Sequence, residues 1–112
     1  MDVFNAIAEA KRRQVLEALR GTESSVNDIV AILAWPQPQV SKHLAVLRKV
    51  GLVVVRREGR KKLYRIDAAK LKPIHAWTAT FEQYWENQLD KIKARAEAKA
   101  KELKTEAPKP PA

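Results

Sequence analysis

Hydrogen-bonding side chains gather at residues 37–42 of this 112-residue chain. A glutamine amide can pair with adenine, a lysine ammonium with guanine, and a serine hydroxyl with either a base or a phosphate. On a helix these side chains lie away from the apolar positions, and we expect them to read base edges in the major groove of DNA. An ordinary solvated helix face has the same pattern. The residues are Gln37, Gln39, Ser41 and Lys42.

Positive charge is concentrated in the residues that follow. The chain holds 22 Lys and Arg against 13 Asp and Glu, and nine of those cations lie between residues 42 and 65 with a single acid, Glu58. Such a segment attracts polyanions, nucleic acid first and acidic membranes or proteins second. Because Glu58 is the only acid close by in the sequence, we expect little ion pairing and predict contacts with DNA phosphates. The predicted contacts are Arg48, Lys49, Arg56, Arg57, Arg60, Lys61 and Lys62.

Several short helices must precede and position this face. Apolar spacing predicts two helices within residues 3–19, with a break near Lys11–Arg13. A third helix is predicted over residues 26–33, where Ser25 and Asp28 have the spacing of an N-terminal cap.

The helix that carries the base-reading residues is predicted over residues 37–50. Trp35-Pro36 ends the preceding helix, and Pro38 is tolerated because amides of a first turn have no acceptor within the helix. At 100° per residue one face of this helix packs inward. That face comprises Val40, Leu44 and Leu47.

A hairpin and a long helix complete the predicted order. Residues 52–56 and 63–66 are rich in β-strand formers and flank a glycine-containing turn at residues 58–61. Asp67 can cap a last helix that starts at about Ala68. Its apolar residues are spaced by three and four positions throughout, which is typical of an amphipathic helix. They are Ile74, Trp77, Phe81, Trp85, Leu89, Ile92 and Ala96.

Residues 4–66 resemble the arsenical-repressor (ArsR-type) winged helix-turn-helix proteins. The resemblance rests on the run from Val40 to Val53, VSKHLAVLRKVGLV, and on the run from Arg56 to Ile66, RREGRKKLYRI. It implies a mainly α fold with a small β-hairpin wing in the order α-α-α-α-β-β-α. It also implies homodimers that pair through their first and last helices, bind an inverted-repeat operator and block transcription.

Two segments depart from the family pattern. Glu9-Ala10-Lys11-Arg12 stands where members commonly have Asp-Pro-Thr-Arg, and Ala34-Trp35-Pro36 replaces a turn that usually carries glycine and a serine cap. Losing the cap costs about 1 kcal/mol of helix stability. We expect Pro36 to restrict the turn instead, and Trp35 to fill the space between the two helices.

Three parts are expected within one domain. Residues 1–67 would form the winged helix-turn-helix, residues 68–95 a dimerisation helix, and residues 96–112 a fraying helix with a disordered Pro/Lys tail. The predicted dimer interface consists of Phe4, Ile74, Trp77, Phe81, Trp85, Leu89 and Ile92. The aromatic run at 77–85 has a second interpretation, a pocket for an apolar effector within that interface.

Metal binding and catalysis have little support in the sequence. There is no cysteine, and the two histidines, His43 and His75, are far apart. His75 could bind a metal ion together with Asp67 or Glu86 of the other copy in a dimer. The spacing of these residues, however, does not match the ligand pattern of the metal-sensing members that the family resemblance implies. His43 is expected to pack or to contact phosphate. With three glycines and no nucleophile–base pair in a recognisable setting, we predict neither an enzyme nor a cofactor.

These patterns favour a sequence-specific DNA-binding repressor that acts as a homodimer, without metal regulation. We expect it in the bacterial cytoplasm, at the nucleoid, since no signal peptide or membrane span is evident. Two alternatives remain open. One is a protein-interaction module whose basic hairpin is merely solvated, and the other is a chromatin-like protein that binds DNA without regard to sequence.

Overall fold

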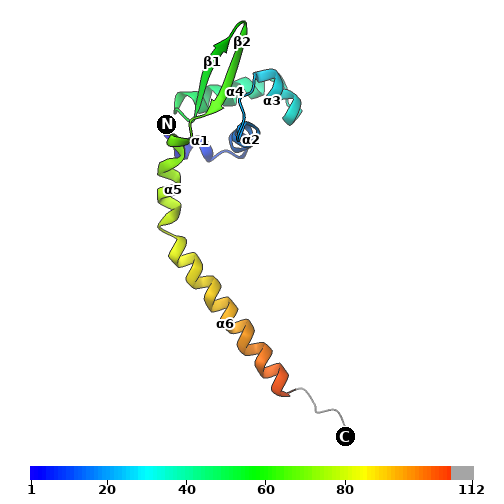
Figure 1. The fold of residues 1–112 in the computed structure, drawn as a ribbon, viewed down its shortest axis with the longest axis vertical. Coiled ribbons are helices and arrows are strands. Elements are labelled where there is room, and N and C mark those ends of the chain that lie inside the picture. The colour runs from blue at the N-terminus through cyan, green and yellow to red at the C-terminus, as the bar shows by residue number, and fades with distance from the viewer. Residues whose placement is uncertain (107–112) are drawn as a thin grey trace. The chain divides into compact units, whose positions relative to one another are not determined.

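The computed structural model describes residues 1–106, and the chain divides into a unit from Met1 to His75 and a second unit from Ala76 onward. The first contains α1 (Val3–Ile7), α2 (Ala10–Leu19), α3 (Val26–Leu33), α4 (Gln37–Lys49), β1 (Val53–Glu58), β2 (Lys61–Ile66) and the 3-10 helix η1 (Ala68–Leu71) (Figure 1). α5 (Lys72–Ala79) crosses the division, and α6 (Glu82–Glu106) belongs to the second unit.

The core of the first unit lies where α1, α2, α3 and α4 meet the start of β1. α4 contributes the largest share, because its residues recur at the three- and four-residue spacing that keeps one helix face inward. The prediction for that face is confirmed. The buried apolar residues are Ala6, Val15, Leu16, Leu19, Ile29, Val40, Leu44, Leu47, Leu52 and Val53.

α3 begins at the predicted cap. The backbone N–H of Asp28 donates to Ser25 Oγ at 3.2 Å, and the backbone N–H of Ser25 donates to Asp28 Oδ2 at 2.9 Å. This second hydrogen bond favours the carboxylate and lowers the pKa of Asp28. The reciprocal pair satisfies two amides that the helix itself leaves without acceptors.

The break between the first two helices lies earlier than predicted, at residues 8–9 instead of Lys11–Arg13. Arg12 Nε donates to the carbonyl of Ala6 at 2.6 Å, and an Arg13 guanidinium nitrogen donates to that of Ile7 at 2.7 Å. These side chains belong to α2 and satisfy the last carbonyls of α1. The arginines therefore close the break from inside the following helix.

The two strands form the predicted antiparallel hairpin. Val53 faces Ile66 at its base, and Glu58 faces Lys61 at its tip. Gly59 has a φ of 62°, a left-handed conformation that a two-residue hairpin turn requires and that glycine adopts without strain. The loop before α3 joins the sheet at one point, where Ser24 and Tyr64 exchange backbone hydrogen bonds of 3.0 and 2.8 Å.

The prediction of one continuous last helix from Ala68 is wrong, because three separate helices, η1, α5 and α6, occupy this region. Pro73 has no N–H to donate, and its ring clashes with a helical carbonyl four residues earlier, which separates η1 from α5. α5 ends where Thr80 Oγ1 donates to the carbonyl of Trp77 at 2.7 Å and Phe81 N donates to that of Thr78 at 3.0 Å. Among the described residues, no helix has the length and apolarity needed to cross a membrane.

Candidate nucleic-acid interface

α4 presents two faces of opposite character. Its inner face is anchored in the core, with Val40, Leu44 and Leu47 at most 1% exposed. On the other side Gln37, Lys42 and the C-terminal pair Arg48 and Lys49 are exposed, while Gln39 and Ser41 are half-buried. The core therefore fixes the rotation of α4 about its axis, which directs Lys42 outward and leaves Gln39 and Ser41 at the two borders between the inner and outer faces.

The turn before α4 holds a non-glycine residue in a left-handed conformation. Ala34 ends α3 with a φ of 56° and a ψ of 38°, where a Cβ is disfavoured. Pro36 precedes α4 and offers no capping side chain, while its carbonyl accepts from the amides of Gln39 and Val40 at 3.1 and 3.3 Å. The turn is restricted by backbone geometry in place of a serine cap.

His43 lies inside the core, 3% exposed, and not at a phosphate-contacting edge. Its ring packs edge-on to Trp35 with centroids 6.2 Å apart, and its Nε2 lies 3.9 Å from Glu9 Oε1. Burial lowers the pKa of His43 from 6.5, and nearby Glu9 only partly opposes this shift. Of the two interpretations of this histidine, packing is therefore confirmed. Trp35 is half-buried against the same core, as expected.

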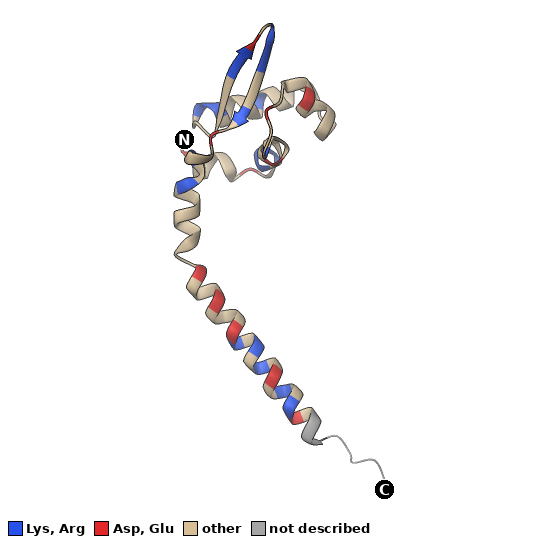
Figure 2. Cartoon of the chain, viewed as in Figure 1, with Lys and Arg blue, Asp and Glu red and all other residues tan. Residues whose placement is uncertain are grey.

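The hairpin sorts its cations onto two faces. Side chains alternate along a strand and cross-strand partners share a face, so Arg57 and Lys62 project together. Arg56 projects from the opposite face. Two like charges directly opposite each other destabilise a hairpin unless an anion lies between them. Figure 2 shows the basic residues along both strands.

α4 and the hairpin together build a cationic groove. A hollow of about 270 Å³ is lined by Arg48 of α4 together with Val55, Arg56, Arg57 and Lys62 of the hairpin. A second hollow of about 430 Å³ lies along α4 and is lined by Ser41, Ala45, Arg48, Lys49, Leu44 and Tyr64. The small Ala45 leaves the helix backbone accessible here. A polar helix face and a cationic strand face thus border the same surface, which suits a duplex with its base edges and phosphates.

Arg56 departs from the sequence-based expectation of unpaired wing cations. Its Nε and Nη2 donate to the carboxylate of Glu23 at 2.6–2.9 Å, and Nη2 also donates to Glu58 at 3.2 Å. The hydrogen bonds from Arg56 lower the pKa of Glu23, and those to Glu23 raise the pKa of Arg56. Glu23 was missed because it lies 33 positions away in sequence.

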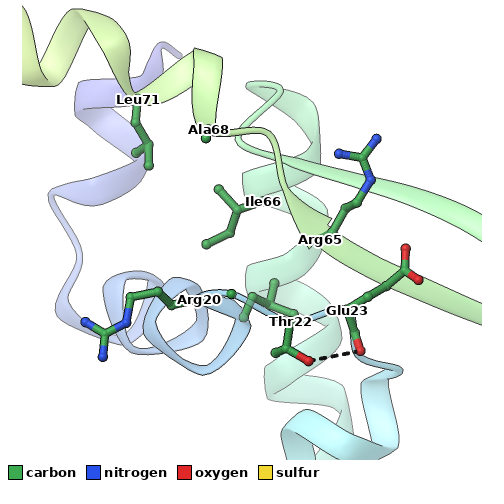
Figure 3. Close-up of a pocket in the computed structure, with 9 residues that line it drawn as sticks. Arg20, Thr22, Glu23, Arg65, Ile66, Ala68 and Leu71 are labelled. Atoms are coloured by element: carbon green, nitrogen blue, oxygen red, sulfur yellow. Dashed lines mark hydrogen bonds between the residues drawn. The ribbon is translucent and has the colours of Figure 1, made fainter.

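A further hollow of about 590 Å³ lies at the base of the hairpin. Its lining comes from the end of α2, the loop before α3, the end of β2 and η1, with none from α4. Figure 3 shows Ile66 and Leu71 on one side of it and the charged Arg65 and Glu23 on another. This hollow is separate from the surface bordered by α4 and the cationic strand face.

The predicted dimer residues fall into both units and are mostly exposed. In the first unit Phe4 is 38% exposed and Ile74 is half-buried. In the second unit the Trp77 and Phe81 rings pack edge-on with centroids 5.2 Å apart. Trp85, Leu89 and Ile92 are between 45% and 62% exposed. Large apolar side chains left open in this way are typical of a contact surface.

The chain has the winged helix-turn-helix fold: two short helices in sequence, α3 and α4, followed by a hairpin wing. Residues 9–55 match the model of the family described as "Bacterial regulatory protein, arsR family". The arsenical resistance operon repressor of Escherichia coli is 30% identical over 96 residues, which cover 84% of this chain and 79% of that protein. The chain belongs to the arsR family.

Two more comparisons support this assignment. The HTH-type transcriptional regulator KmtR of Mycobacterium tuberculosis is 43% identical over 67 residues, or 60% of this chain. The match spans about half of that relative, 52% of its length. A homodimeric winged helix-turn-helix DNA-binding domain from Mycobacterium bovis aligns with a TM-score of 0.59 at 32% identity, covering 71% of this chain and 77% of that one. The family and these relatives are transcriptional regulators and not enzymes, as the sequence predicts.

Proposed function

We propose that this protein is a sequence-specific transcriptional repressor that binds an inverted-repeat operator as a homodimer and occludes the promoter. The observation that carries the proposal is the joint surface of α4 and the wing, where Arg48, Arg57 and Lys62 line one groove beside the exposed face of α4. Two recognition helices related by a two-fold axis would enter successive major grooves about 34 Å apart.

The proposal divides the surface by task. The exposed face of α4 reads bases through Gln37, Gln39, Ser41 and Lys42. The phosphate contacts are Arg48, Lys49, Arg57, Arg60, Lys61 and Lys62, and Arg56 joins them only when it leaves Glu23. Residues 1–67 bind DNA, and residues 68–95 pair the two copies through the residues predicted above. Residues 96–112, which were predicted to form a fraying helix and a tail, lie partly outside the described residues. Within this segment α6 continues to Glu106.

We propose regulation without a metal ion. The chain has no cysteine, and among the side chains that the structure describes no three of His, Asp or Glu form a group that could hold a metal ion. The E. coli relative is named a repressor of an arsenical resistance operon, which supports repression as the output. The proposed location is the cytoplasm, on the nucleoid DNA.

Two substitutions test the division of tasks. Lys42→Ala should reduce binding to the DNA upstream of the protein's own gene while leaving most binding to random duplexes. Arg60→Ala should weaken both and lower the slope of log affinity against log salt by about 1. Fluorescence anisotropy over a salt series measures both quantities. If the two variants change specific and random binding alike, the division is wrong.

The same titration separates the alternative functions. A specific repressor should prefer its operator over random DNA by about a thousandfold or more at physiological salt. Equal affinity would favour a chromatin-like protein. No affinity at low salt would favour a protein-interaction module.

A further inference from the structure

The outermost stripe of α4 consists of four exposed residues, two of them apolar and two of them basic. At 100° per residue they lie within an arc of about 60° on the side of the helix opposite the buried face. Gln39 and Ser41 lie outside this arc, one on each side of it, and are half-buried. The four residues that extend furthest from the core are therefore Pro38, Lys42, Ala45 and Lys49.

The two apolar members of this stripe cannot hydrogen-bond to a base edge. Pro38 belongs to the first turn of α4 and Ala45 to its middle, and neither side chain has a donor or an acceptor. Of the four bases, thymine alone presents a methyl group in the major groove. An apolar side chain held against the donors and acceptors of the other bases would displace water without replacing its hydrogen bonds. Pro38 and Ala45 therefore favour thymine.

The surface around Ala45 is shaped for a short apolar group. The hollow of about 430 Å³ along α4 is lined by Ala45 together with Leu44 and with Tyr64 of β2. A contact between two methyl groups requires a close approach of the helix to the base, because neither group is long. The small side chain of Ala45 permits this approach. The remaining residues that line the hollow are polar or basic, namely Ser41, Arg48 and Lys49.

Lys42 lies between the two apolar residues and relates them to one base pair. A rise of 1.5 Å per residue places Lys42 about 6 Å from Pro38 and about 4.5 Å from Ala45 along the helix axis. Successive nucleotides of a strand advance about 3.4 Å, so each separation spans one to two base pairs. We infer that Pro38 and Ala45 contact thymine methyl groups on either side of a guanine that Lys42 binds, each within two base pairs of it. The inference rests on the proposed function and specifies what α4 reads.

Duplexes that the full-length protein selects from a random pool supply the probe. We expect each enriched half-site to contain a guanine with a thymine, on either strand, within two base pairs on both sides. An enriched half-site whose guanines are flanked only by G·C pairs overturns the inference and leaves the proposed repressor standing. If no sequence is enriched, both the inference and the proposed function fail.

Removing single methyl groups from the selected duplex is the sharper test. Replacing one of these thymines by deoxyuridine removes the C5 methyl and leaves the base pairing unchanged. In one half-site, each replacement should raise the Kd of the parent protein about fourfold, the value of one buried methyl group. The same replacement outside both half-sites is the control and should leave the Kd unchanged. Fluorescence anisotropy at a fixed salt concentration measures each Kd, and equal affinity for the thymine and deoxyuridine half-sites overturns the inference.

Two protein variants assign each methyl group to its side chain. Ala45→Gly removes the methyl group from α4, and Pro38→Ser replaces the ring by a polar side chain. Each variant should bind the thymine and deoxyuridine duplexes alike at one position of the half-site and keep the fourfold difference at the other. The ratio is taken within one protein, so a general loss of helix stability does not mimic this result.

The control for helix stability is Ala31→Gly on α3. It carries a helix penalty similar to that of Ala45→Gly and should keep the preference for thymine at both positions. If Ala45→Gly and Pro38→Ser also keep both preferences, other side chains read the methyl groups and the inference is overturned.

Discussion

Leu47 of α4 and Leu89 of α6 show how differently the two units use apolar side chains. Leu47 is 0% exposed and belongs to a core built from four helices and a strand, whereas Leu89 is 45% exposed on a helix with no buried residue in its described part. Both residues recur at helical spacing in the sequence. An apolar stripe in a sequence therefore predicts that the helix packs against another surface. Only the fold shows whether that surface belongs to the same chain, as for Leu47, or must come from another molecule, as for Leu89.

The largest expected effect separates these two leucines. Leu47→Ala should destabilise the fold by about 2–5 kcal/mol, because it leaves a cavity in a core that cannot fully collapse. Thermal unfolding should show a lower Tm at every protein concentration. Leu89→Ala is the matched control, and it should lower the Tm only at concentrations where the parent protein is dimeric. Equal, concentration-independent losses in both variants would contradict the comparison.

A smaller gain is expected at the turn before α4. Ala34→Gly should stabilise the fold by about 1 kcal/mol, since Ala34 has a φ of 56° and glycine adopts this conformation without a Cβ clash. Ala31→Gly, inside α3, is the control and should destabilise by a similar amount. Urea unfolding measures both changes. A loss of stability in Ala34→Gly would show that the turn is not strained.

The buried histidine of α4 should make stability depend on pH. The pKa of His43 is lowered in the folded protein. Below pH 6.5 the unfolded chain therefore takes up a proton on His43 more readily than the folded protein does. Stability should therefore be complete above the ordinary value of 6.5 and fall as the pH drops through the folded pKa. The groups that set this shift are the desolvating core, Glu9, Lys11, Arg12 and Lys42.

Comparing the parent with His43→Leu checks this dependence. Urea unfolding between about pH 7.5 and pH 5.5 should show a smaller loss in the variant, because leucine has no proton to bind. Identical pH profiles would mean that His43 titrates alike in both states.

The smallest effect is expected at the ion pair between the wing and the loop before α3. Glu23→Gln should leave stability nearly unchanged, since both groups lie at the surface, but it frees Arg56 for DNA phosphate. Affinity for any duplex should rise slightly and the salt slope should steepen. Glu17→Gln on α2 is the control for the loss of one negative charge. If both variants act alike, net charge alone explains the change.

Local signals in the sequence predicted much of the fold. Ser25 and Asp28 marked the start of α3, and the spacing of Val40, Leu44 and Leu47 gave the inner face of α4. Two of the failures involve side chains that bond to another element, and the third involves a side chain that ends its own helix. Arg12 and Arg13 reach back to α1, Thr80 closes α5 inside an otherwise regular apolar stripe, and Arg56 finds Glu23 across the fold.

The candidate site was predicted from residue types, and its layout required the fold. The sequence placed the polar face on one helix, because helical spacing is a local property. The sequence alone did not show which wing cations share a face of the hairpin. That depends on the alternation of side chains along each strand and on the register, which place Arg57 and Lys62 on one face and Arg56 on the other. Only the packing of the hairpin against α4 brings the wing cations Arg56, Arg57 and Lys62 to the hollow that Arg48 also lines.

The central claim is that the α4 face and the wing together read one DNA sequence as a dimer. Selection of duplexes from a random pool, followed by sequencing of the bound fraction, tests it most directly. We expect enrichment of an inverted repeat whose half-sites are centred about one helical turn, or 10–10.5 base pairs, apart. A bound fraction without any enriched sequence would contradict it.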